Sequence, residues 1–379
     1  MAHLTRRQLL AATAAAPLAA QQGEFVLRGK KPMIVHNDFP EDLESLPEYL
    51  ASWITPNDSF FVRQHLPRPR VDAAAWRVET GGMVNQKLSL SIADLRSMSQ
   101  LTVAATLECA GNGRGNFRPR MPGLQWTKGA IGNAHWRGPR LRDVLLKAGA
   151  SPQAAYVDFD GADVPVGKVP EFIRSIPMRK AMHESTILAV EMNGVPLPDV
   201  HGFPLRLIVP GWDGASWVKW VNSIQVQAQP NPGFYMATAY KYPRVAAVPG
   251  GAVKPEDMEV LEGMAVKSFF AKPGEGAKVR VGQSVTLAGI GWGGENRVTR
   301  VDVSADGGAS WRAAVLGRED FPFAWRTFSF EWKPARPGYH VLCCRAADSA
   351  GRTQPIDAAW NPPGYLNNSI ERLGVVVEG

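Results

Sequence analysis

Short apolar runs separated by glycine and proline dominate the first two thirds of the chain, and few segments have helical spacing. Residues 140–148 place apolar side chains on one face before Gly149, which predicts a helix that ends at this glycine. Ser91-Ile-Ala-Asp94 has the pattern of a capping box and predicts the start of a second short helix. Residues 47–54 are a further helical candidate, so this region is expected to mix short strands with a few helices.

In the last third of the chain, apolar and polar side chains alternate with the period of a strand. Phe328, Phe330 and Trp332 alternate in this way, and so do the valines that follow residue 278. Asp306-Gly307-Gly308 separates two such runs and predicts a hairpin. Several strands with turn signals between them predict a β-sandwich.

A cluster of six prolines between residues 230 and 277 marks the change from the mixed pattern to the strand-only pattern. We place the boundary near residue 245, which predicts one domain over residues 21–245 and an all-β domain over residues 246–379.

The N-terminus has the features of an export signal. Residues 4–20 contain the pair Arg6-Arg7, then a short alanine-rich apolar run and a small-residue end. This pattern predicts a twin-arginine signal peptide over residues 1–20 and a periplasmic location; the alternative is an amphipathic N-terminal helix. Because this route carries folded proteins, often with a cofactor inserted, a cofactor is expected. No other stretch is long and apolar enough to predict stable membrane insertion.

Composition narrows the function classes. With 45% apolar and 20% charged residues, the chain is expected to be globular, and three cysteines are too few for a disulfide scaffold or a Cys₄ zinc site. Cys343 and Cys344 are expected to be packing residues, with a strained vicinal disulfide as the alternative. The net charge of +7 suits an anionic small molecule or an acidic partner protein. No dense basic run or nucleic-acid motif is present, so no nucleic acid is expected.

The segment with the clearest chemistry is residues 102–119. An apolar run ends at Glu108-Cys109 and opens into a loop with glycines at 111, 113 and 115. The glycine spacing, and Arg118-Pro119 where a helix should begin, exclude a dinucleotide fingerprint. Arginines near Cys109 favour its thiolate, which could be a nucleophile or a soft metal ligand. The alternative is a buried packing cysteine.

Cationic side chains recur in two further segments. Arg63 and His65 are two residues apart, so on a strand they share a face. His201, Arg206 and Lys219 follow in later loops. Donors of this kind, drawn from separate loops, suit a phosphate or another oxyanion, because charge-assisted hydrogen bonds to oxygen are strong.

Five motifs in this order resemble the sulfite oxidase family of molybdopterin enzymes, over a match that runs from about residue 30 to the C-terminus. They are Phe61-Val-Arg-Gln-His-Leu-Pro67, Glu108-Cys-Ala-Gly-Asn-Gly-Arg114, Glu191-Met-Asn-Gly-Val-Pro-Leu-Pro198, His201-Gly-Phe-Pro-Leu-Arg206 and Val218-Lys-Trp220. The resemblance implies an α+β molybdopterin-binding domain with the sulfite oxidase fold. An all-β immunoglobulin-like sandwich, which makes a homodimer, is expected to follow it.

The resemblance also assigns roles to residues. Cys109 would be the thiolate ligand of molybdenum. The molybdopterin cofactor would be bound by a set of polar side chains, namely Arg63, His65, Cys109, Asp163, His201, Arg206, Ser216 and Lys219. Arg63, Arg114 and Tyr240 would face the substrate, with Trp126 as a pocket wall, and the catalytic set would be Arg63, Cys109, Arg114 and Tyr240.

The implied activity is oxidation of sulfite to sulfate by oxygen-atom transfer at molybdenum, with electrons passed to an acceptor such as a c-type cytochrome. No haem is expected, because no Cys-x-x-Cys-His motif or preceding haem domain is found. Pro363 stands where vertebrate relatives have a pocket arginine, which leaves room for another sulfur compound. The alternatives are a sulfur-compound dehydrogenase subunit, a sulfoxide reductase, or a cofactor-free exported binding protein.

Overall fold

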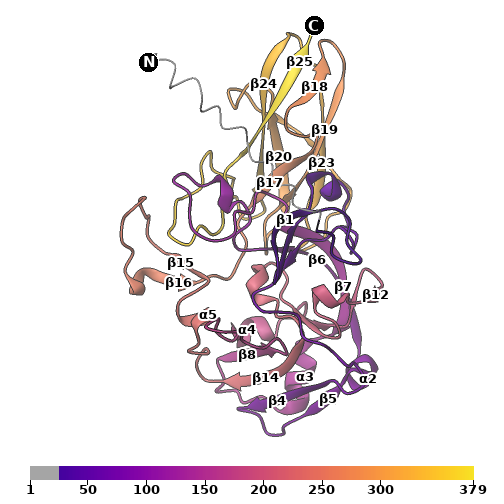
Figure 1. The fold of residues 1–379 in the computed structure, drawn as a ribbon, viewed down its shortest axis with the longest axis vertical. Helices are drawn as coiled ribbons and strands as arrows, with labels where there is room; N and C mark the ends of the chain where they lie inside the picture. Colours follow the sequence, from indigo (N-terminus) through magenta and orange to yellow (C-terminus); the bar gives the residue numbers. More distant parts are fainter. Residues whose placement is uncertain (1–24) are drawn as a thin grey trace, which may run out of the picture.

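The computed structural model describes residues 25–379, so the export signal predicted over residues 1–20 lies outside the described residues. Two units are stacked along the long axis of the molecule (Figure 1). The first unit comprises residues 25–240, and the second unit comprises residues 261–379. Within residues 25–379, no helix is long and apolar enough to cross a membrane.

The first unit is built from small sheets with short helices around them. Its largest sheet has the order β5-β4-β14-β8-β9, a second has the order β12-β11-β7-β6, and β1-β2-β3 and β10-β13 are smaller. The strands are β1 (Ile34–Asp38), β2 (Glu41–Glu44), β3 (Val62–Arg63), β4 (Arg77–Gly82), β5 (Ser89–Ser91), β6 (Gln100–Glu108), β7 (Ile131–Pro139), β8 (Tyr156–Gly161), β9 (Arg174–Pro177), β10 (Ile187–Ala189), β11 (Glu191–Met192), β12 (Val195–Pro196), β13 (Arg206–Ile208) and β14 (Val221–Gln227). The α-helices are α2 (Ile92–Ser97), α3 (Leu141–Ala148), α4 (Met178–Ala181) and α5 (Phe234–Ala237), and the 3₁₀ turns are η1 (Pro47–Leu50), η2 (Arg114–Asn116), η3 (Asp199–His201) and η4 (Gly214–Ser216).

The predicted helices form where their local signals are strongest. At the start of α2, Ser91 Oγ accepts from the Asp94 backbone N–H at 3.1 Å, and the Asp94 carboxylate accepts from the Ser91 N–H at 2.8 Å. This capping box was predicted and is confirmed. Helix α3 ends at Gly149, which has a left-handed φ of 65°. The candidate over residues 47–54 is shorter than predicted, a single 3₁₀ turn, η1, that begins at a proline.

The second unit is the predicted sandwich of two sheets, β17-β19-β23-β22 and β18-β25-β24-β20-β21. Its strands are β17 (Lys267–Lys272), β18 (Ala277–Arg280), β19 (Val285–Trp292), β20 (Val298–Ser304), β21 (Arg312–Ala313), β22 (Val315–Leu316), β23 (Arg326–Trp332), β24 (Gly338–Asp348) and β25 (Glu371–Glu378). The turn at Asp306-Gly307-Gly308 joins β20 to β21 as predicted. The hairpin of β15 (Lys241–Pro243) and β16 (Met258–Val260), with η5 (Pro255–Asp257) before β16, links the two units, and residue 245 lies within it.

Cys343 and Cys344 lie next to each other on β24. Both are fully buried and neither is disulfide-bonded. Neighbouring side chains on a strand point to opposite faces, so the two sulfur atoms do not meet. Cys344 packs in the core of the sandwich with residues such as Leu342 and Val301. The two cysteines are therefore packing residues, as predicted.

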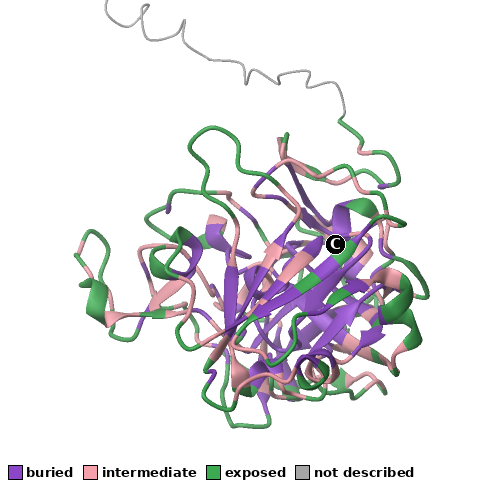
Figure 2. Cartoon of the chain, turned by 90° about the horizontal axis from the view of Figure 1, so that it is seen from below, coloured by how far each residue is buried: buried purple, intermediate pink, exposed green. Residues whose placement is uncertain are grey.

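The two units share a buried interface. Leu50 and Ile131 of the first unit pack against an aromatic and aliphatic group of the second, namely Met264, Phe269, Ile290, Trp292 and Trp325. Figure 2, which colours residues by burial, shows that buried segments fill the centre of the molecule while exposed loops lie at its edge.

A buried charge crosses this interface. The Glu108 carboxylate accepts from Lys267 Nζ at 3.3 Å, Asn112 Nδ2 at 3.0 Å and Trp292 Nε1 at 2.8 Å. All four side chains are buried. Because Glu108 directly precedes Cys109, side chains of the second unit hold the backbone on which the cysteine sits.

Replacement of Lys267 tests this interdomain ion pair. In Lys267→Met, Glu108 would remain buried without a counter-charge, which should reduce the free energy of unfolding by about 3–5 kcal/mol. The matched control is Lys278→Met, which removes an exposed ion pair to Glu378 and should cost less than about 1 kcal/mol. Urea unfolding measures both variants, and equal losses would contradict the role given to Lys267.

Candidate active site

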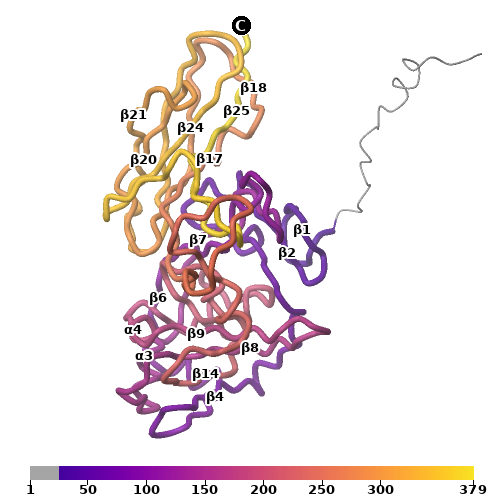
Figure 3. The backbone as a smooth tube through the Cα atoms, turned by 90° about the vertical axis from the view of Figure 1, so that its left-hand side faces the viewer, coloured from indigo at the N-terminus to yellow at the C-terminus, as the bar shows by residue number. Residues whose placement is uncertain are grey.

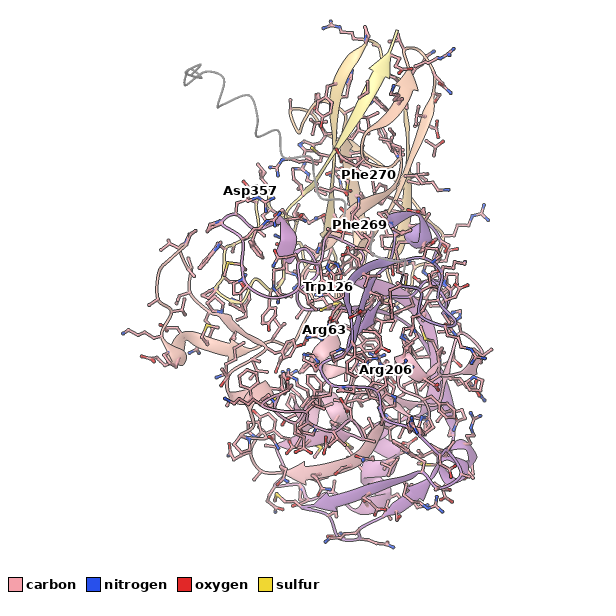
Figure 4. All side chains as sticks on the ribbon, viewed as in Figure 1. Arg63, Trp126, Arg206, Phe269, Phe270 and Asp357 are labelled. Atoms are coloured by element: carbon pink, nitrogen blue, oxygen red, sulfur yellow. The ribbon has the colours of Figure 1, made fainter. Side chains whose placement is uncertain are left out.

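One cavity in the first unit contains a cysteine and most of the predicted cationic residues. The enclosed volume of this cavity is about 60 Å³, and its mouth is open to solvent. Its walls come from the loops that follow β3, β6 and β8, from η3, β13 and η4, and from the segment before β15. Figure 4 places the labelled Arg63 and Arg206 near the middle of the molecule.

Eight of the predicted site residues meet in this cavity. They are Arg63, His65, Cys109, Asp163, His201, Arg206, Lys219 and Tyr240. They come from segments that are up to 177 residues apart in the sequence, counted from Arg63 to Tyr240. The fold therefore brings together what the sequence only suggested, a thiol surrounded by positively charged donors.

One part of the cavity wall is strongly cationic. Arg206 donates from Nη1 to the His201 carbonyl at 3.1 Å, and its buried Nε has no hydrogen-bond partner within residues 25–379. Burial lowers the pKa of Arg206 to about 9. Burial, and then Arg206, lower the pKa of Lys219 well below its usual value. Asp163 is the carboxylate that offsets part of this charge at Lys219. Buried cations of this kind need an anion to compensate them.

Cys109 lies directly after β6, at the end of the strand that the sequence predicted. Its backbone N–H donates to the Ala130 carbonyl at 2.9 Å, and its own carbonyl accepts from the Asn112 N–H at 2.9 Å. Burial raises the pKa of the thiol, and the positive charges of Arg63 and Arg114 offset this only in part. The sequence argument for a stabilised thiolate was therefore wrong in its net direction, because desolvation outweighs the arginines. A bound soft metal ion would displace the proton.

The buried Tyr240 pairs with the half-buried His65. The Tyr240 hydroxyl lies 2.6 Å from His65 Nε2. Burial raises the pKa of Tyr240 well above its usual value, and burial and Arg63 lower the pKa of His65 well below its usual value. The tyrosine thus keeps its proton and donates it to Nε2, and the neutral imidazole carries its own proton on Nδ1. Tyr240 has a left-handed φ of 54°, and its ring stacks on Tyr365 at 5.5 Å.

Comparison with known proteins assigns the chain to a family. A family model described as "Oxidoreductase molybdopterin binding domain" matches residues 65–235, and a "Mo-co oxidoreductase dimerisation domain" matches residues 258–378. The sulfite oxidase of Gallus gallus is 37% identical over 355 residues, covering 89% of this chain and 76% of that protein. The sulfite oxidase of Arabidopsis thaliana is 33% identical, covering 86% of this chain and 88% of that protein. The chain belongs to the sulfite oxidase family.

One further relative shows how much of a longer protein this chain spans, and a solved structure shows its fold. The mitochondrial sulfite oxidase of Homo sapiens is 38% identical over 90% of this chain, but the chain spans only 65% of the length of that protein. The crystal structure of the sulfane dehydrogenase SoxCD from Paracoccus pantotrophus superposes with a TM-score of 0.77. It covers 96% of this chain and 93% of that chain at 26% identity. The predicted sulfite oxidase fold is thereby confirmed.

Arg114 does not line the cavity, in contrast to the expectation for a sulfite oxidase family pocket. Its Nε donates to the Pro363 carbonyl at 3.1 Å, and its Nη1 donates to the Leu124 carbonyl at 3.2 Å. A Cβ atom on Gly111 would lie 2.8 Å from Arg114 Nη1. Gly111, two residues after Cys109, therefore makes room for this guanidinium.

Trp126 and Ser216 also lie outside the cavity wall. Trp126 is fully buried, with its ring 4.6 Å from the His36 ring, and it does not line this cavity, so its role as a pocket wall stays a prediction. The Ser216 hydroxyl donates to Asp213 Oδ2 at 3.2 Å behind the wall. Its neighbours Ala215 and Trp217 line the cavity, and the cofactor-binding role of Ser216 stays a prediction.

Three contributors were missed by the sequence argument. Phe172 lines the cavity and stacks on the His65 ring at 4.3 Å, and Trp217 lines it beside η4. Tyr365 stacks on Tyr240 from the second unit. Figures 1 and 3 both show the yellow segment before β25 descending beside the loop that follows Cys109, where the Leu366 N–H donates to the Ala110 carbonyl at 3.0 Å. Only the aromatic residues in the Trp360–Asn368 segment could have indicated such a contact.

The residues of the cavity fit a molybdopterin cofactor. The unpartnered Nε of Arg206 offers a donor for an anionic group. Lys219, whose ammonium donates to the Arg63 carbonyl at 3.0 Å and to Gln64 Oε1, adds positive charge to the same cavity. The thiol of Cys109 offers the soft ligand that molybdenum needs. The two kinds of group share one cavity, as a metal held by an anionic organic ligand requires.

Alkylation of the cofactor-free protein tests the environment of Cys109. Because burial raises its pKa, the rate of reaction with iodoacetamide should still be rising above pH 9. Cys109→Ser should abolish the reaction, since Cys343 and Cys344 are fully buried. Mass spectrometry of the modified peptide measures the rate, and a plateau below pH 8 would contradict the assignment.

Proposed function

We propose that this protein is a periplasmic molybdenum enzyme that oxidises sulfite to sulfate and passes the electrons to an external acceptor such as a c-type cytochrome. The observation that carries the proposal is the meeting of Cys109 with the buried cations and Arg63 in one cavity. The similarity to sulfite oxidases over 85% or more of the chain supports the choice of substrate.

The cationic part of the cavity would hold the cofactor. Arg206, Lys219 and His201 would bind its anionic end, and Cys109 would provide the thiolate ligand to molybdenum. The bound cofactor would supply two-electron oxygen-atom transfer. The chain itself contributes the binding energy, the orientation of the cofactor and the exclusion of water by aromatic walls such as Phe172 and Trp217.

Arg63 is placed to bind the substrate anion. About a quarter (26%) of its side chain is exposed in the cavity, and its Nη1 is 3.2 Å from Asp42 Oδ1. The carboxylate of Asp42 helps to keep the pKa of Arg63 above its usual value, so the guanidinium stays charged. It would attract sulfite and align it. The protonated hydroxyl of Tyr240 closes the same side of the cavity through its bond to His65.

Export and assembly complete the proposal. The Arg6-Arg7 pair and the alanine-rich run after it support export in the folded state. The dimerisation domain over residues 258–378 supports a homodimer. Electrons would leave to a separate protein, because we assign no haem to this chain.

A second candidate is oxidation of a sulfane-type sulfur compound. The structural similarity to a sulfane dehydrogenase favours it, and so does Pro363, which supplies only a backbone carbonyl to Arg114. A pocket without a further arginine side chain at this position binds a small dianion less tightly and leaves space for a larger substrate.

A substrate panel on metal-loaded enzyme tests the function. Sulfite should reduce ferricyanide or cytochrome c, and thiosulfate is offered as the alternative electron donor. Sulfoxides are offered separately with a reduced dye, because their reduction consumes electrons. Cys109→Ser should abolish the activity, because the thiolate ligand is lost, and Arg63→Gln should lower kcat/KM for sulfite by about tenfold or more, because one charge-assisted contact is removed. The readout is steady-state kinetics, with molybdenum content measured for each variant.

The outcomes separate the two candidates. Preference for thiosulfate with little sulfite turnover would favour the sulfane-type reaction. Full activity in Cys109→Ser would contradict the metal-ligand assignment in either case.

A further inference from the structure

Lys30 is a buried lysine in the N-terminal segment whose ammonium reaches a cavity residue. Its Nζ lies 2.6 Å from the Asn57 carbonyl, 2.6 Å from the Phe60 carbonyl and 2.7 Å from His201 Nε2. The side chain is only 8% exposed. The Lys30 N–H donates to the Leu27 carbonyl at 2.9 Å, which fixes the turn that carries it.

These three contacts define the proton positions. An ammonium has three N–H donors and no acceptor, and here two of them meet carbonyl oxygens, so the third points to His201 Nε2. A neutral imidazole that accepts at Nε2 must carry its proton on Nδ1. Within residues 25–379, Lys30 Nζ is the side-chain partner of the His201 ring, and the backbone of Asn57, which also accepts from Lys30, acts on the same ring. Nδ1 is then the ring nitrogen left to donate to a ligand. A neutral Lys30 would instead accept from Nε2–H and leave Nδ1 as a lone pair, which repels an anion.

The charge of Lys30 adds to the buried positive charges of Arg206 and Lys219. Burial lowers its pKa to about 7, and the acidic group that raises it is Asp58, which already pairs with Lys31. Burial, and after it the charges of Lys30, Arg206 and Lys219, lower the pKa of His201. An uncharged donor would satisfy the two carbonyls equally well, so a buried charge here is useful only if an anion binds nearby.

We propose that Lys30 is a positioning residue of the cofactor site, whose ammonium fixes His201 in the tautomer that donates from Nδ1 to the anionic end of the cofactor. This inference rests on the proposed function, since it needs an anionic cofactor in the cavity. It adds a residue of the N-terminal segment, outside the motifs of the family, to the groups that hold the cofactor.

Retention of the cofactor tests this role. Molybdenum and pterin per chain are measured for the purified full chain and during long dialysis. Lys30→Met should lose pterin about tenfold faster than the wild type or more, because a charge-assisted contact to the site is removed. Lys30→Gln should behave in the same way, since its amide can serve the carbonyls but carries no charge. The matched control is Lys31→Met, whose exposed pair with Asp58 does not reach the cavity and which should match the wild type.

The arms of the experiment separate the possible failures. A wild-type chain without pterin would overturn the proposed function and this inference with it. A wild-type chain that keeps its pterin no better than Lys30→Met and Lys30→Gln would overturn only the role of Lys30.

Nitrogen NMR of the histidine rings in the cofactor-free chain gives a readout independent of the cofactor. His201, identified by His201→Gln, should carry its proton on Nδ1 in the wild type and in Lys31→Met. In Lys30→Met the proton should distribute between both ring nitrogens. An unchanged tautomer in Lys30→Met, with an unchanged thermal unfolding midpoint, would overturn the positioning role.

Discussion

The burial of several positive charges around one cavity is the constraint on which the site depends. Arg206, Lys219 and Lys30 all have pKa values lowered by burial, and few carboxylates lie near enough to compensate them. Removing a cation from water without a partner costs several kcal/mol. An anionic ligand that binds in the cavity offsets this cost by compensating the buried positive charges. The affinity for the ligand and the stability of the folded protein are therefore linked. The folded protein is thus expected to be more stable with the anionic ligand bound than without it.

A second constraint joins the cavity to the other unit. The loop after Cys109 is held from three directions by residues beyond position 260: Lys267 contacts Glu108, the Leu366 N–H donates to Ala110, and the Pro363 carbonyl accepts from Arg114. The cysteine therefore sits between two rigid sheets, which fixes its geometry better than a loop of one domain could. The sandwich thus supports the loop that carries Cys109, as well as being a candidate dimer surface.

Local sequence patterns predicted the helices and strands, and also those residues whose place follows from where a strand begins or ends. The capping box at Ser91, the alternation in the sandwich and the placement of Cys109 after a strand needed only neighbouring residues. Contacts between distant segments could not be predicted in this way. Tyr365 meets Tyr240 across 125 positions and Lys30 meets His201 across 171, and no periodicity links such pairs. The predicted direction of the pKa shift of the Cys109 thiol was wrong for the same reason, because the burial that raises this pKa depends on the whole fold.

The glycines after Cys109 show that the same sequence pattern can make room for different groups. Glycine permits close approach, and the sequence alone does not say what approaches. Here it is the side chain of Arg114, whose guanidinium packs against Gly111 and Gly123 and whose Cγ packs against Gly364. Two of these glycines lie outside the motif, and one belongs to the second unit, so the cradle is visible only in three dimensions. Because Pro363 offers Arg114 its backbone carbonyl, this contact is independent of the side chain at position 363. Substitution at position 363 can therefore keep the position of Arg114 unchanged.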